Sequence, residues 1–200
     1  MFRSILVLET PWVTESVKSA SVWPFISEFA NAMDLYAYHQ IFTDTNSFCH
    51  WINVFNKEKN ITMPKLLYIA AHGGVGQICG LKNRINGSTI IEKLKKSKTI
   101  NYVHFGSCLF GNIPNLESLL KKAKHIKMAA GYKKTVDWVD STAFELMLWQ
   151  RIATRVDDTK NLKLHTIVKE FVKDEVPGLA ISLGFRCSYR YGKVIKTIAC

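Results

Sequence analysis

The sequence has few of the features that mark membrane-spanning, disulfide-rich or zinc-binding proteins. No apolar run approaches the roughly 18 residues that a membrane-spanning helix requires. The five cysteines are odd in number, and none forms the C-x-x-C pair typical of structural zinc sites. We therefore expect reduced thiols, no metal, no cofactor and no membrane partner.

The first residues do not have the pattern of a secretory leader. The short apolar stretch that begins at Ser4 is followed by Glu9 and Pro11, where a signal peptide would have small residues and a cleavage site. This pattern predicts a first strand and a cytoplasmic protein.

Acidic residues are scarce. The chain has 16 Asp and Glu against 27 Lys and Arg, which gives a formal net charge of +11. Lysines concentrate in 93–98, 121–124 and 133–134, positions that predict exposed helix faces and a loop. A basic surface attracts acidic partners and polyanions. Because no nucleic-acid-binding motif accompanies the charge, nucleic acid is not the partner we expect, although the charge leaves that alternative open.

A phosphate-binding loop is also missing. The glycines of 74–80 miss the G-x-G-x-x-G spacing by one residue, and no G-K-[ST] sequence occurs. These glycines instead predict a hairpin-like excursion through 77–81.

Short apolar runs alternate with segments of helical spacing along the whole chain. We expect strands at 4–9, 35–42, 66–71, 100–105, 126–130 and 181–189, and helices at 22–33, 46–57, 88–96, 116–123, 141–156 and 162–176. This alternation is typical of an α/β fold with right-handed crossovers. No repeat or linker divides the chain, so we expect one domain, residues 1–200, with a mostly parallel sheet of about six strands flanked by helices.

Two of the predicted strands end in small-residue turns that carry a reactive side chain. One strand is followed by His72-Gly73, and another by Gly106-Ser107-Cys108. Ligands bind beyond the carboxyl ends of parallel strands, so the imidazole and the thiol can meet across one crevice. A histidine beside a cysteine generates the thiolate nucleophile and later protonates the leaving amine, and glycine lets backbone N–H groups approach an oxyanion.

The order of these features resembles the caspase-like (clan CD) cysteine peptidases, a group that includes caspases, metacaspases, separases and CHAT-type domains. Downstream, Ala129-Ala130-Gly131-Tyr132, then 136–140 and a long helix through Phe144, resemble the strand, pocket loop and helix of small bacterial CHAT-type domains. The resemblance implies a caspase-like three-layer sandwich and a single caspase-like peptidase domain over residues 1–200. It also implies a cysteine endopeptidase acting on proteins or peptides, as a regulated bacterial effector controlled by an activating partner or a small-molecule signal.

Within this resemblance, His72 is the general base and acid, Cys108 is the nucleophile, and the amides of Gly73 and Cys108 form the oxyanion hole. One departure concerns the turn after the nucleophile. The caspase signature has a glycine two residues after the cysteine, whereas Gly111 follows three residues after it.

The loops that build the primary substrate pocket in caspase-like proteins correspond here to Glu9, Glu15, Asp137 and Asp140. Acidic residues there would bind a Lys or Arg side chain at the cleavage position through charge-assisted pairing. A structural alternative is that Asp140 caps the helix expected to begin near Ser141.

Two other functions remain open from the sequence. An α/β-hydrolase arrangement would use Cys108, Asp140 and His165 in the order nucleophile, acid, base. A catalytically silent binding module would instead use the basic surface for a nucleotide, nucleic acid or an acidic protein.

Overall fold

The computed structural model describes residues 2–11, 20–58, 64–158 and 163–200. Its centre is a seven-stranded sheet in the order β10-β9-β8-β7-β3-β1-β2. The strands are β1 (Ser4–Glu9), β2 (Tyr36–Ile41), β3 (Lys65–Ala70), β7 (Ile100–Gly106), β8 (Met128–Tyr132), β9 (Phe185–Tyr191) and β10 (Val194–Ala199). Neighbouring strands among β8, β7, β3, β1 and β2 are parallel, whereas β9 pairs antiparallel with both β8 and β10. The prediction of a mostly parallel α/β sheet is therefore confirmed.

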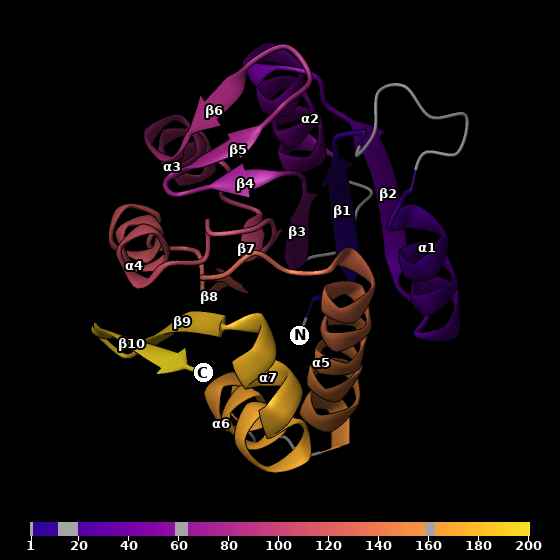
Figure 1. The fold of residues 1–200 in the computed structure, drawn as a ribbon, viewed down its shortest axis with the longest axis vertical. Helices are drawn as coiled ribbons and strands as arrows, with labels where there is room; N and C mark the ends of the chain where they lie inside the picture. The colour runs from indigo at the N-terminus through magenta and orange to yellow at the C-terminus, as the bar shows by residue number, and fades with distance from the viewer. Residues whose placement is uncertain (1, 12–19, 59–63, 159–162) are drawn as a thin grey trace.

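Helices cover both faces of this sheet (Figure 1). One layer consists of α2 (Thr45–Lys57), α3 (Gly87–Lys96) and α4 (Ile113–Lys122). The other consists of α1 (Trp23–Ala32), α5 (Trp138–Asp158), α6 (Leu164–Glu170), the π-helical turn η1 (Phe171–Glu175) and α7 (Pro177–Leu183). Among the described residues, no helix has both the length and the apolar character needed to cross a bilayer.

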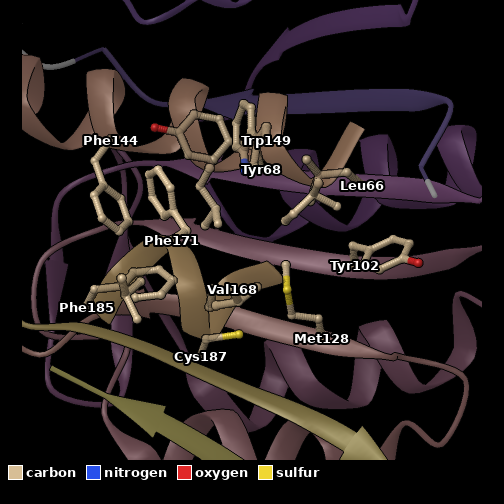
Figure 2. Close-up of a cluster of buried hydrophobic side chains, with 14 of the residues drawn as sticks. Leu66, Tyr68, Tyr102, Met128, Phe144, Trp149, Val168, Phe171, Phe185 and Cys187 are labelled. Atoms are coloured by element: carbon tan, nitrogen blue, oxygen red, sulfur yellow. The ribbon is translucent and has the colours of Figure 1, made fainter. Parts of the chain in front are cut away.

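The central strands are buried on both faces, which explains their continuous apolar sequences. Side chains alternate between the faces, so Leu66 and Tyr68 of β3 join one hydrophobic core while Leu67 and Ile69 join the other. Figure 2 shows part of the first core, in which Tyr68 lies beside Trp149 of α5. Alternate residues along each central strand therefore pack against opposite helical layers.

A second, three-stranded sheet follows β3. It contains β4 (Gly73–Gly74), β5 (Gln77–Cys79) and β6 (Arg84–Asn86), which pair antiparallel in that order beside α3 (Figure 1). It corresponds to the excursion expected through 77–81.

The expected elements needed correction at several ends. Residues 181–183 belong to α7, which ends at Gly184 in the left-handed conformation (φ 61°), so the strand expected from Ile181 begins only at Phe185. Strand β10, where exposed and partly buried residues alternate, was not predicted, so the sheet has seven strands and not about six. The helix expected at 162–176 is interrupted by the π-helical turn.

Two helix starts also differ from the expected ones. The cap of α2 is Asp44, which forms a capping box with Ser47, so the helix begins at Thr45. Helix α4 begins at Ile113, one residue before Pro114, because proline is compatible with the first turn of a helix.

Candidate active site

The register of β3 and β7 brings the two predicted catalytic residues to the same edge of the sheet. Ala70 of β3 is paired with Gly106 of β7. His72 and Cys108 each follow two residues beyond this pair, in the turns that leave the two adjacent strands. His72 is exposed and Cys108 is partly buried. Both side chains therefore belong to the carboxyl edge of the sheet, where ligands bind in this class of fold.

The two turns are in backbone contact through Gly73. A Cβ atom placed on Gly73 would lie 2.2 Å from the carbonyl oxygen and 3.1 Å from the amide nitrogen of Cys108. Only glycine permits this approach. Among the hydrogen bonds between described residues, the Cys108 N–H donates to no backbone carbonyl. The two residues predicted to form the oxyanion hole are therefore in backbone contact, and the Cys108 N–H has no backbone acceptor that would compete with an oxyanion.

The turn after Cys108 is strained. Leu109 has a positive φ of 61°, and the N–H of Phe110 donates to the Cys108 carbonyl at 2.7 Å, which defines a classic-type γ-turn. Rare backbone conformations of this kind cluster at functional sites. Gly111 then packs against β8, where its N–H donates to the Tyr132 carbonyl at 2.9 Å. The displaced glycine that departs from the caspase signature is therefore required by the contact with β8.

The loop between β8 and α5 reaches the sulfur. The Val136 N–H donates to the Cys108 Sγ at 3.5 Å, and the Val136 carbonyl oxygen lies 4.0 Å from the same sulfur. A backbone N–H directed at sulfur is complementary to a thiolate. This loop therefore lies against the candidate nucleophile, and its role as a substrate-pocket loop stays a prediction.

Asp137 and Asp140 follow this contact at the start of α5. Asp137 is the cap: its Oδ1 accepts from the N–H groups of Val139 at 2.8 Å and Asp140 at 3.2 Å. Helix α5 consequently begins at Trp138, and the expected start near Ser141 with Asp140 as cap is wrong. Both carboxylates are exposed at the end of the loop that touches Cys108.

Glu9 ends β1 beside Ala70 but is only 1% exposed. Its carboxylate accepts from the Val22 N–H at 2.9 Å and from the Ser21 hydroxyl at 2.7 Å, and it lies 2.8 Å from His39 Nε2. These contacts tie the start of α1 to the sheet. Both carboxylate oxygens of Glu9 are thus engaged within the protein, and its predicted contact with a substrate is not observed in this arrangement. Glu15, the other acidic candidate of this loop, lies outside the described residues.

His165 is far from Cys108. Its ring stacks on Tyr189, and Tyr189 pairs with Met128 at the first residue of β8. This is the amino end of the parallel strands, whereas Cys108 follows the carboxyl end of β7. The α/β-hydrolase arrangement of Cys108, Asp140 and His165 is therefore wrong.

A buried polar network beneath the site was not predicted from the sequence. His104 is fully buried, with Nε2 3.5 Å from Glu145 Oε1 and Nδ1 accepting from Trp149 Nε1–H at 3.3 Å. The Tyr132 hydroxyl donates to Glu145 at 2.9 Å, and Tyr68 also contacts this carboxyl group. The sequence pointed to this network only through Glu145, which is next to Phe144 on the apolar side of α5.

Burial sets the protonation of this network. Desolvation raises the pKa of Glu145 to about 8, although hydrogen bonds from Tyr68 and Tyr132 act in the opposite direction. Desolvation lowers the pKa of His104 to about 3. The Tyr68 pKa is raised, first by burial and then by Glu145. Near neutral pH the network is therefore largely uncharged, and it packs against β3 and β7 a few residues before the turns that carry His72 and Cys108.

The described residues contain no cluster of three or more His, Cys, Asp or Glu side chains suited to a metal ion. The five cysteines are free thiols. The described site offers the Cys108 thiol and the His72 imidazole on two turns whose backbones are in contact at Gly73.

The chain matches no protein-family model, and no curated protein matches its sequence. Its structure is similar to a secreted C11 cysteine protease from Bacteroides thetaiotaomicron, solved in complex with an irreversible peptide inhibitor, with a TM-score of 0.54 and 10% identity. That similarity covers 94% of this chain and 66% of the protease, so the chain spans slightly less than two thirds of its length. It is also similar to Caspase-1 from Spodoptera frugiperda, with a TM-score of 0.51 and 12% identity over 98% of this chain and 86% of the caspase. The chain therefore has a caspase-like fold, as the resemblance implied.

Proposed function

We propose that this chain is a cysteine endopeptidase that hydrolyses peptide bonds in proteins through His72 and Cys108. The observation that carries the proposal is the contact of Gly73 with the backbone of Cys108, which joins the turns that hold the two side chains. Structures of the same fold belong to cysteine proteases, one of them solved with a peptide inhibitor, which supports a peptide substrate.

The reaction needs only groups at this edge of the sheet. His72 removes the thiol proton, and the Cys108 sulfur attacks the carbonyl carbon of the scissile bond. The N–H groups of Gly73 and Cys108 stabilise the oxyanion of the tetrahedral intermediate. His72 then protonates the leaving amine, and it activates the water that hydrolyses the acyl-enzyme.

The finer assignments form part of the same proposal. We assign Asp137 and Asp140, at the end of the loop that touches the sulfur, to the recognition of a basic side chain at the cleavage position. The kinship with bacterial CHAT-type domains and a regulated effector role with an activating partner or signal remain predictions from the sequence resemblance. A cytoplasmic location remains a prediction from the pattern of the first residues.

The test is hydrolysis of a mixed-sequence fluorogenic peptide library by purified protein. We expect Cys108→Ala and His72→Ala to abolish turnover, and Cys79→Ala to retain it, since Cys79 is a partly buried free thiol on the neighbouring small sheet. Iodoacetamide should inactivate the wild type in proportion to the alkylation of Cys108, as measured by mass spectrometry. Equal turnover by Cys108→Ala and the wild type would exclude the proposal.

A silent binding module makes a different prediction. It predicts no turnover by the wild type under any activating condition, together with partner binding that survives Cys108→Ala.

A further inference from the structure

A pocket of about 590 Å³ lies at the opposite end of the sheet from Cys108. Its lining includes Tyr102, Lys127, Lys163, His165, Tyr189 and Tyr191. Tyr102 is near the start of β7, six residues before Cys108, which separates the pocket from the nucleophile by about 20 Å along the strand. The proposed peptidase site uses none of these residues.

The walls of this pocket are aromatic. The His165 ring lies flat on Tyr189, with centroids 5.0 Å apart and planes 3° from parallel, and it meets Tyr191 edge-on at 5.2 Å. Tyr191 is 43% exposed, so a large part of it remains available to a ligand. Figure 2 shows Tyr102 at the margin of the buried cluster, with its hydroxyl directed away from the other aromatic side chains. Flat aromatic faces with an adjacent hydroxyl suit a planar ring.

The charge of the pocket is positive. The ammonium groups of Lys163 and Lys196 lie 5.2 and 4.9 Å from the centroid of the Tyr191 ring, and Lys127 is exposed at the lining. None of the lining residues is acidic. Burial and then the charges of Lys163, Lys196 and Lys169 lower the pKa of His165, which is the expected response to a positive field.

One lining cation has another role. The Arg190 guanidinium donates to the Leu120 carbonyl, on the α4 side of the sheet, and we do not count it toward the pocket. The available lining cations are therefore Lys127 and Lys163, on flexible side chains, and Lys163 now lies over the Tyr191 ring with the neighbouring Lys196. They can turn from that ring to an anionic group that enters beside it.

We propose that this pocket binds a nucleoside monophosphate. The base stacks on the exposed Tyr191 ring, beside the stacked pair of His165 and Tyr189, and Lys163 and Lys127 hold the phosphate. Aromatic faces alone would suit any planar apolar ligand, and lysines alone would suit any anion. Their combination selects a molecule that carries both a planar ring and a phosphate. The volume of about 590 Å³ is that of a site for one small ligand.

The test is direct calorimetric titration of the full chain with AMP, adenosine and inorganic phosphate at one fixed salt concentration. We expect AMP to bind at least 10-fold more tightly than either fragment. Tyr191→Ala and Lys163→Glu should each weaken AMP binding at least 10-fold. Lys82→Glu is the matched control, because it changes the charge equally at an exposed position on the turn beside the small sheet. Circular dichroism and thermal melting verify that the variants are folded.

A second readout reports the pocket itself. AMP should raise the pKa of His165 in an NMR titration, because a phosphate opposes the field of the lysines. Cys108→Ala should bind AMP like the wild type, so the result does not depend on peptidase activity.

Three results would each overturn the proposal. The first is equal binding of phosphate and AMP, which indicates an anion site without base recognition. The second is an equal loss of affinity in Lys82→Glu and Lys163→Glu, which indicates general charge attraction. The third is the absence of saturable AMP binding while single-stranded RNA binds, which indicates a polyanion surface.

Discussion

Gly73 lies so close to Cys108 that a Cβ atom on the glycine would be 2.2 Å from the Cys108 carbonyl oxygen. This contact joins the first residue after His72 to the residue proposed as nucleophile. Because the contact is between backbones, a side chain on Gly73 cannot be accommodated by a change of rotamer. One of the two turns has to move.

We predict that Gly73→Ala lowers kcat/KM for peptide hydrolysis by about 100-fold, since small displacements of reacting groups have effects of this size. Gly74→Ala is the matched control, because a Cβ atom there would meet only the Gln77 side chain, at 3.4 Å. It should retain activity within about 3-fold, a change smaller than 1 kcal/mol in the barrier. Steady-state kinetics of the two variants measure the difference, and equal activities would contradict the role assigned to the contact.

The turn after the nucleophile provides a prediction about stability. A Cβ atom on Gly111 would lie 2.1 Å from the Tyr132 amide nitrogen and 2.2 Å from the Gly131 carbonyl carbon. We expect Gly111→Ala to lower the free energy of unfolding by about 3 kcal/mol, the upper part of the range for overpacking.

Gly178 is the opposite case. It lies in α7, and a Cβ atom there would meet nothing within 4 Å. Gly178→Ala should therefore stabilise the protein by about 0.5 kcal/mol through lower entropy of the unfolded chain. Urea denaturation of both variants tests this contrast, and the same sign for both would contradict it.

The positions of His72 and Cys108 at one sheet edge could be predicted because both follow strands of a parallel sheet, and parallel strands end at the same side. The burial of His104 is consistent with its place inside the apolar strand expected at 100–105. The contact of Val136 with Cys108 depends on how a loop folds back from β8, and no local pattern encodes that path. Strand β10 was missed because its exposed positions make it resemble a polar segment.

The buried acidic residues also depend on contacts between distant segments, which the sequence does not reveal. Glu9 was placed correctly at the end of β1, but its partner His39 comes from the neighbouring strand and is 30 residues away in sequence. The burial of Glu145 follows from the rotation of α5 against the sheet. A single sequence does not define either relationship, because both depend on packing between distant segments.

The buried network predicts how stability depends on pH. Its titratable members are Glu145, His104, Tyr68 and Tyr132. Burial raises the pKa of Glu145 from its ordinary 4.5 to about 8, so the folded protein holds a proton that the unfolded chain releases between these values. Burial lowers the pKa of His104 from 6.5 to about 3, so between those values the unfolded chain holds the additional proton. Stability therefore falls with rising pH through Glu145 and rises with pH through His104.

These slopes oppose one another between pH 4.5 and 6.5, and above 6.5 the His104 slope fades while that of Glu145 dominates. We expect the free energy of unfolding to fall by about 1 kcal/mol from pH 6.5 to 8 in the wild type. Glu145→Gln should remove this fall, whereas Glu92→Gln, at an exposed glutamate of α3, should keep it. Chemical denaturation at several pH values measures the slope, and an unchanged slope in Glu145→Gln would show that another group titrates.

The last prediction separates two roles of Asp137. Its Oδ1 caps α5, and its charge lies one residue beyond the backbone that contacts the Cys108 sulfur. Asp137→Ser keeps a capping oxygen and removes the charge, whereas Asp137→Ala removes both. We expect Asp137→Ala alone to lose about 1 kcal/mol of stability. Both variants should lose at least 10-fold in kcat/KM for substrates with Lys or Arg at the cleavage position, relative to a substrate with a neutral residue there. If Asp137→Ser keeps the wild-type preference, the carboxylate serves the helix alone, and recognition of the substrate belongs to other residues.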